Sequence, residues 1–282
     1  RIVERIAPGR PAITVDGPRT HYPALVGLFG FLFFELCFHD PANGTILGSA
    51  MVLYTVGTMI GVYRYGRGWL AVGEGFTVLF AKLAAISPFF WQDGGLRLRP
   101  AFSGLSTLPV RRGTNAVVLM VLGGTTFDGV SRTTFWRNLI RDTGDWEGTL
   151  YNTFGMIWTI GMVAVAYLLA VRAAAGITGS DPGELADDFL PSLVPITLAY
   201  AVAHYFSLAV FEGQNFFFLI SDPFAKGWNL FGTADNTIDY LVVSTATISW
   251  VQAAAIVLGH VAAVVIAHDR SLELFDSDKA LK

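Results

Sequence analysis

The sequence is poor in cysteine and in charged residues. Cys37 is the single cysteine, which excludes an intrachain disulfide and any metal site built from several cysteines. Charged residues make up 15% of the 282 positions, whereas a soluble globular domain carries about 25%. No basic stripe with interleaved aromatic residues is present, so nothing in the sequence indicates nucleic-acid binding. The shortage of charge argues against an ordinary soluble domain.

Motifs of familiar chemistry are missing as well. The sequence contains neither HExxH nor GxSxG, the patterns of zinc proteases and of α/β-hydrolases. Ser207 lies three residues from His204, and two residues at that spacing on one helix do not form a catalytic triad. No internal repeat is evident, so an inverted-repeat transporter receives no positive support. Whether the chain is an enzyme stays open.

Long apolar runs dominate what is present. Hydrophobic residues make up 53% of the chain. Six runs approach the roughly 20 residues that an α-helix needs to cross about 30 Å of hydrocarbon. The expected fold class is therefore an all-α, polytopic transmembrane helical bundle. The six expected spans are residues 22–38, 45–63, 114–130, 150–173, 189–211 and 241–267.

Residues 70–91 form a seventh apolar stretch that contains Glu74 and Lys82. If it crosses the membrane, lysine and arginine divide almost evenly between the two sides. If it returns to its own side, most of them lie with the chain termini, as expected of cytoplasmic loops. We therefore expect six spans with 70–91 as a re-entrant or interfacial helix, and seven spans as the alternative. Both ends of this segment would then be cytoplasmic, in a multi-pass protein of the cell membrane.

Three parts follow from this pattern. Residues 1–20 are polar and begin with arginine, and we expect them to be the start of a fragment of a longer chain. Residues 21–270 form the transmembrane helical domain, and residues 271–282 form a polar C-terminal tail.

The connecting segments are less regular. A small hairpin-like or irregular cap is expected within 92–113, and a short interfacial helix within 131–148, where Trp136 and Trp146 accompany charged residues. The acidic stretch DPGELADD, residues 181–188, reads as a solvated loop.

Ionisable residues inside apolar helices are candidates for function because burying them in lipid is unfavourable. In the six-span topology, carboxylates and a histidine from three helices share one depth on the side away from the basic loops. They predict an outward-facing polar pocket that binds a small solute or an ion. The pocket residues are Glu35, Asp128, His204, Glu212 and Gln214, with His260 and Glu74 as secondary candidates.

A divalent metal such as zinc is the cofactor that this set suggests, with His204, Asp128 and Glu212 as its ligands. His204 and Glu212 lie about 12 Å apart along an unbroken helix, so sharing one ion would require a break at Gly213.

Each residue also has an ordinary structural interpretation. Asp128 could pair with Arg132, Glu35 could snorkel or pair with a loop arginine, and His204 could form a hydrogen bond between helices. Glu35 and His39, four residues apart at a helix end, could also pair directly.

Five stretches of the sequence resemble a family of polytopic membrane proteins from actinobacteria and haloarchaea, labelled fenitrothion hydrolase-like or hypothetical membrane proteins. The stretches are FLFFELCFHDPANGTILG, RGWLAVGEGFTVLFAKLAAISPF, GGTTFDGVSRTTFW, AYAVAHYFSLAVFEGQ and VLGHVAAVVIAHDRSL. The label implies hydrolysis of organophosphates, and the resemblance implies further membrane helices upstream. It carries over no catalytic role to any residue, although Glu35, Glu74, Asp128, His204, Gln214 and His260 lie within the matching stretches.

Three functions remain. The preferred one is a permease-like protein that binds or transports a small solute or metal ion in the outward-facing pocket. The alternatives are a membrane-embedded, metal-dependent phosphoester hydrolase and a structural or accessory subunit of a larger membrane complex. The expected partners are the lipid bilayer and either other membrane subunits or further copies of this chain.

Overall fold

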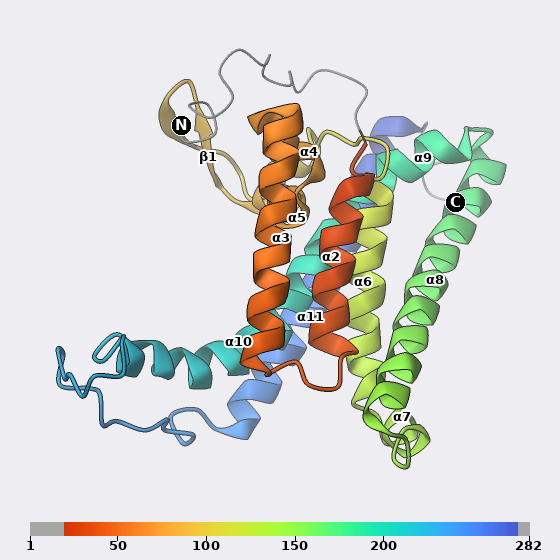
Figure 1. The fold of residues 1–282 in the computed structure, drawn as a ribbon. Coiled ribbons are helices and arrows are strands. Elements are labelled where there is room, and N and C mark those ends of the chain that lie inside the picture. Colours follow the sequence, from red (N-terminus) through yellow and green to blue (C-terminus); the bar gives the residue numbers. More distant parts are fainter. Residues whose placement is uncertain (1–19, 276–282) are drawn as a thin grey trace. The chain divides into compact units, whose positions relative to one another are not determined.

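The computed structural model describes residues 20–275, which form helices and one small sheet (Figure 1). The chain divides into two compact units. The first comprises Arg1–Val194 with Ala267–Lys282, and the second is Pro195–Ile266. The expectations for the polar N-terminal segment and for most of the C-terminal tail lie outside the described residues.

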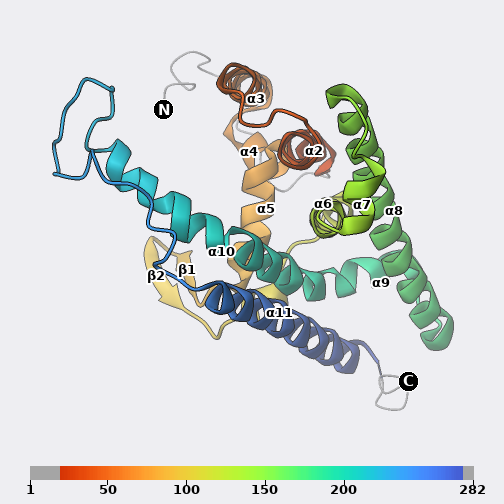
Figure 2. The ribbon, with the colours of Figure 1, turned by 90° about the horizontal axis from the view of Figure 1, so that it is seen from below.

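Helix α6 (Thr114–Ser131) occupies the centre of the first unit, between α2 (Tyr22–Leu36) and α8 (Asp145–Thr178) (Figures 1 and 2). Two adjacent glycines permit this close packing. A Cβ atom on Gly123 would lie 2.3 Å from the Cα atom of Ile160 on α8, and one on Gly124 would lie 2.8 Å from a methyl carbon of Leu32 on α2. Small residues at such contacts let helices approach where lipid supplies no hydrophobic drive.

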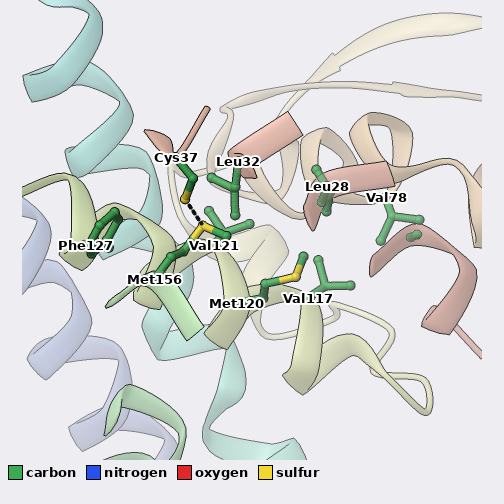
Figure 3. Close-up of a cluster of buried hydrophobic side chains, with 10 residues drawn as sticks. Leu28, Leu32, Cys37, Val78, Val117, Met120, Val121, Phe127 and Met156 are labelled. Carbon is green, nitrogen blue, oxygen red and sulfur yellow. Dashed lines mark hydrogen bonds between the residues drawn. The ribbon is translucent and has the colours of Figure 1, made fainter. Parts of the chain in front are cut away.

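The side chains between these helices form the core of the first unit (Figure 3). The thiol of Cys37 donates to Sδ of Met156 at 3.7 Å, so this cysteine lies buried in an apolar environment. The core residues are Ala24, Leu28, Leu32, Cys37, Val78, Val117, Met120, Val121, Phe127 and Met156.

The ambiguous seventh segment is a broken helix beside α3 (Gly44–Tyr65). Its first half joins η1 (Arg67–Trp69) to α4 (Leu70–Gly73), and its second half joins α5 (Gly75–Leu83) to η2 (Ala84–Ile86). The halves meet at 70°, a geometry found in broken spans and in re-entrant loops. The bend fits both the expected re-entrant helix and the alternative of a seventh span, so the re-entrant helix stays a prediction.

A two-stranded antiparallel hairpin follows the broken helix. Strand β1 (Phe89–Gln92) pairs with β2 (Gly95–Leu98), and Asp93 and Gly94 adopt positive φ at the turn. The hairpin was expected within 92–113, so its first strand begins earlier than predicted. A short helix, η3 (Ser103–Leu105), lies in the rest of this connection.

Two short helices flank α8. The first is α7 (Thr134–Leu139), which lies within the segment expected to hold a short helix. After α8, the acidic stretch predicted as a solvated loop is instead α9 (Pro182–Phe189), followed by η4 (Leu190–Leu193), so that prediction was wrong. The Asp181 side chain caps α9 by accepting from two backbone N–H groups, and α9 packs its leucine and alanine side chains against α8.

The second unit contains most of α10 (Val194–Leu219) and of α11 (Thr245–Leu274). The two helices pack closely. A Cβ atom on Gly259 would lie 2.3 Å from the Cβ atom of Ala199, and Nε2 of Gln252 donates to the carbonyl of Ala203 at 3.0 Å. The long connector between them folds around the buried hydroxyl of Ser221, which accepts from the backbone N–H of Phe231 at 3.0 Å.

Within residues 20–275, four helices are long and apolar enough to cross a membrane, or five if the bent pair counts as one span. The expected spans 45–63, 150–173 and 189–211 fall within these helices, and the expected span 241–267 begins four residues before the fourth helix. The first expected span is a shorter apolar helix of 15 residues, and the third forms α6, which carries polar residues at both ends and is not among the candidates. The count of six or seven spans is therefore not confirmed. The candidate spans are Gly44–Tyr65, Asp145–Thr178, Pro182–Leu219 and Thr245–Leu274.

Candidate functional site at the helix break

The bend is fixed by an aromatic side chain packed against glycines. A Cβ atom on Gly61 of α3 would lie 2.7 Å from the ring of Trp69, and one on Gly73 of α4 would lie 2.5 Å from the same ring. On the other side, a Cβ atom on Gly75 would lie 3.0 Å from the carbonyl oxygen of Ala24 on α2. The broken helix is therefore held between α3 and α2 by contacts that only glycine permits. Glycine on both sides of Glu74 also weakens the helix at this point.

Glu74 replaces the hydrogen bonds that the break removes. Its backbone is extended, with φ −88° and ψ 122°. In a continuous helix the N–H groups of Phe76 and Thr77 would donate to the carbonyls of Val72 and Gly73. Here they donate to the two carboxylate oxygens of Glu74, at 3.0 Å and 2.6 Å. A carboxylate at this position also interacts favourably with the positive end of α5.

Two hydroxyl groups complete the environment of this carboxylate. The hydroxyl of Tyr54, on α3, donates to Oε1 of Glu74, and the hydroxyl of Thr77 donates to Oε2. Four donors therefore converge on one buried carboxylate. We define Tyr54, Glu74 and Thr77 as the break site.

The other half of the break is satisfied by a histidine. Val72, at the end of α4, has lost its usual helical donor, and its carbonyl accepts from Nδ1 of His21 at 3.0 Å. This bond joins the residue before α2 to the broken helix across 51 positions of sequence. The residue before α2 thus satisfies a backbone carbonyl that the break leaves without its helical donor. Non-helical backbone inside a membrane requires such partners because lipid offers none.

The break site brings together a carboxylate and two hydroxyl oxygens. Carboxylate, hydroxyl and carbonyl oxygens are the ligands that hard cations prefer. The negative charge of Glu74 would also attract an organic ammonium group. A small cation would bind here in place of the hydrogen bonds that the hydroxyl groups of Tyr54 and Thr77 donate to the carboxylate. The site contains no residue pattern of nucleophilic catalysis.

Two of the five predicted pocket residues, Glu35 and Asp128, lie in the first unit. Glu35 is near the C-terminal end of α2, and Asp128 is near that of α6, so both lie at the same end of these helices (Figure 1). Oδ1 of Asp128 accepts from Nε of Arg132 at 3.0 Å, which is the ordinary structural interpretation of this aspartate.

The predicted pairing of Glu35 with His39 does not form. His39 instead donates its backbone N–H to Oγ1 of Thr149 at 3.1 Å, and its Nδ1 lies 3.0 Å from the same oxygen.

The other three pocket residues, His204, Glu212 and Gln214, lie in the second unit. Nδ1 of His204 bonds to the hydroxyl of Tyr200, one turn earlier on the same helix, at 2.9 Å. Oε2 of Glu212 accepts from the side chain of Asn215 at 2.8 Å. Helix α10 continues through Gly213 without the break that a common ion site for His204 and Glu212 would require.

Gln214 and His260 make contacts with the backbone. The side-chain amide of Gln214 donates to the carbonyl of Asp239 and accepts from its N–H, at 3.1 Å and 3.0 Å, and so fastens the long connector to α10. Nδ1 of the exposed His260 bonds to the carbonyl of Ile256 at 2.8 Å, one turn earlier on α11.

The predicted metal ligands divide between the units, with Asp128 in the first and His204 and Glu212 in the second. Within residues 20–275 no group of three or more histidine, cysteine, aspartate or glutamate side chains is arranged to hold a metal ion. The zinc set therefore stays a prediction.

Sequence reasoning identified Glu74 but missed its partners Tyr54 and Thr77, and also His21. The spacing of Glu74 and Thr77 is that of an N-cap and its third helical residue, which was an available signal. No signal in the sequence links Tyr54 or His21 to the break, because both contacts depend on tertiary packing. Comparison with known proteins adds no further residues: no family model, curated protein or solved structure matches the chain.

Proposed function

We propose that this chain is a permease-like membrane protein that binds a small cation at the break site and moves it across the bilayer. The observation that carries the proposal is the 70° bend at Glu74, with the carboxylate held at the junction of two half-helices. Transporters of several folds build their solute and ion sites from broken helices of this kind. An ionisable side chain inside an apolar segment is also a functional candidate in its own right.

In this proposal the predicted outward-facing pocket is the entrance to the break site. Glu35 and Asp128 lie at one end of the first unit, where a cation would meet negative charge before reaching Glu74. His204, Glu212 and Gln214 are the pocket residues of the second unit. The resemblance to the fenitrothion hydrolase-like family remains compatible with a multi-pass protein, but no feature of the described residues favours hydrolysis.

Uptake into proteoliposomes tests the proposal. Purified protein would be reconstituted and assayed with radioactive sodium and, separately, with radiolabelled methylammonium as a probe for organic cations. We expect uptake above that of empty liposomes for one of the two, reduced at least tenfold by Glu74→Gln. Glu147→Gln, which neutralises an exposed carboxylate at the start of α8, is the matched control and should transport normally.

Two results would refute this assignment. The first is wild-type protein that neither accumulates nor binds either cation. The second is full uptake by Glu74→Gln, which would remove the carboxylate from the transport step. An accessory subunit would then be the better description, with the exposed aromatic side chains of Phe216 and Phe217 available to a partner.

A further inference from the structure

A second polar cluster extends from the break to the last turn of α5. It consists of His21, Lys82 and Arg111, which we call the basic cluster. His21 precedes α2, Lys82 lies in the last turn of α5, and Arg111 lies just before α6. The side chains of His21 and Lys82 are almost fully buried, with 2% and 4% of their surface exposed.

Lys82 is buried, and none of the described residues supplies it with a counter-charge. It shares the inward face of α5 with Gly75 and Val78, which pack toward α2. Its ammonium group has three N–H donors, and one of them donates to the carbonyl of Pro109 at 3.1 Å. Across residues 20–275, no carboxylate lies within the 4.0 Å that defines an ion pair with Lys82. A buried charge without a partner is strongly unfavourable.

His21 presents a second unsatisfied group. Because Nδ1 donates to Val72, the other ring nitrogen is left for a ligand, and Nε2 is buried with no hydrogen-bond partner among the described residues. Burial lowers the pKa of His21, the bond to Val72 opposes this, and the nearby charges of Lys82 and Arg111 lower the pKa further. Lys82 bonds to the carbonyl of Pro109 and the backbone N–H of His21 bonds to that of Arg112, so both residues contact the short segment that carries Arg111.

Two helix N-termini meet at the same place. Neither α2 nor α6 has a side-chain cap. The backbone N–H of His21 donates to the carbonyl of Arg112 at 2.8 Å, and a Cβ atom on Gly113, the residue before α6, would lie 3.2 Å from the backbone nitrogen of Tyr22. Each N-terminus contributes roughly half a positive charge. The helix ends therefore add to the positive potential of the three side chains.

We infer that the basic cluster binds a phosphate group, supplied either by inorganic phosphate or by the headgroup of an anionic lipid. Lysine and arginine donors beside helix N-termini are the usual environment of bound phosphate. A phosphate would supply the counter-charge that Lys82 lacks among the described residues. Its negative charge would also favour the protonated form of His21, in which Nε2 becomes a donor to the phosphate. This site uses different residues from the break site and does not depend on the proposed transport function.

Thermal unfolding in mild detergent, with inorganic phosphate as the titrant, tests one source. Native mass spectrometry with phosphatidylglycerol against phosphatidylcholine tests the other. We expect one of the two to bind the wild-type protein, with a Kd at least tenfold weaker in Lys82→Met. Lys226→Met removes an exposed lysine of the long connector and should bind like the wild type. Glu74→Gln should also bind normally, which separates this site from the break site.

A second variant keeps the inference testable if Lys82→Met does not fold. Asparagine is a favourable N-cap, so His21→Asn should preserve the start of α2 while removing Nε2, and it should also weaken binding. The inference is overturned if neither probe binds the wild type, or if both variants bind as tightly as it does. It is also overturned if Lys82→Met raises the melting temperature at every phosphate concentration, because Lys82 would then be an uncompensated charge.

Discussion

The hydrogen bond between Tyr54 and Glu74 gives the sharpest test of the break site. Tyr54→Phe removes a donor to a buried carboxylate, and a hydrogen bond to a charged group stabilises a protein by about 1.5–3 kcal/mol. We therefore expect Tyr54→Phe to lower the free energy of unfolding by that amount. Glu74→Ala should lower it further, because it also leaves the N–H groups of Phe76 and Thr77 without their acceptor.

The decisive quantity is the coupling between the two changes. In the Glu74→Ala background the hydroxyl of Tyr54 has lost its acceptor, so replacing Tyr54 by phenylalanine should have almost no further effect. The double-mutant cycle should give a coupling energy of about 1.5–3 kcal/mol. The measurement is equilibrium unfolding of all four proteins in mixed detergent micelles.

Tyr65→Phe provides the control, since Tyr65 is an exposed tyrosine at the end of the same helix. It should change stability by less than about 0.5 kcal/mol. A coupling energy below about 0.5 kcal/mol would show that Tyr54 and Glu74 are not bonded and would refute the geometry of the break site.

Three further predictions concern other parts of the chain. Gly123→Ala should destabilise the first unit by about 1–3 kcal/mol, because the new methyl group would meet the backbone of α8. Gly129→Ala, in open space on the same helix, should be neutral or stabilising by up to about 1 kcal/mol. The melting temperature should fall as the pH drops from about 7 to about 5 and should fall less in His21→Asn. Because the pKa of His21 is held below 6.5 in the folded state, the unfolded chain binds a proton there that the folded chain resists. Gln214→Ala should accelerate amide hydrogen exchange at Asp239, measured by mass spectrometry, with little change in melting temperature, since both of its bonds to that residue hold only the connector.

The long apolar helices were predictable because the hydropathy of consecutive residues adds up along each run. Residues 45–63, 150–173 and 189–211 each lie within a helix long enough to span a membrane, and most of the expected span 241–267 lies within another. Length and hydropathy do not report how helices pack, however, and α6 illustrates the limit. Its polar ends reduce its apolar character, yet it is the most enclosed helix of the first unit. A central helix in a bundle can be sheltered by its neighbours and need not match lipid by itself.

Local signals were also available where the prediction failed. Asp181 followed by Pro182 and Glu184 is a strong start signal for a helix, with an N-cap, a proline in the first turn and an acidic residue beside it. The stretch was predicted to be a solvated loop because it is acidic, although this helix start signal was present. A single glycine, by contrast, was too weak a signal for a break. Helix α10 accommodates Gly213 in a continuous helix, whereas the chain breaks where glycines flank Glu74 on both sides.

The site residues were harder to predict because their roles depend on partners distant in sequence. Glu74 and Lys82 are opposite charges eight residues apart in one apolar stretch. In the structure they do not pair, since Glu74 bonds to Tyr54 and Thr77 while Lys82 bonds to Pro109. The contact of His21 with Val72 joins residues 51 positions apart, and neither composition nor the spacing of residues in the sequence indicates it.

The different surroundings of these two charges bear directly on what each one does. Both suit the dipole of α5, with an acid at its N-terminus and a base in its last turn, but that interaction is worth only about 0.3–1 kcal/mol. Removing an ion from water costs several kcal/mol, so the dipole cannot explain why either side chain is buried. For Glu74, hydrogen bonds from four donors within the protein offset the remaining cost of burial, so its carboxylate is stable without a ligand. Among the described residues Lys82 has a single carbonyl, which satisfies one of its three donors and supplies no negative charge. Of the two, Lys82 is therefore the residue whose burial most requires a bound anion, and the stability of Lys82→Met with and without phosphate measures that requirement.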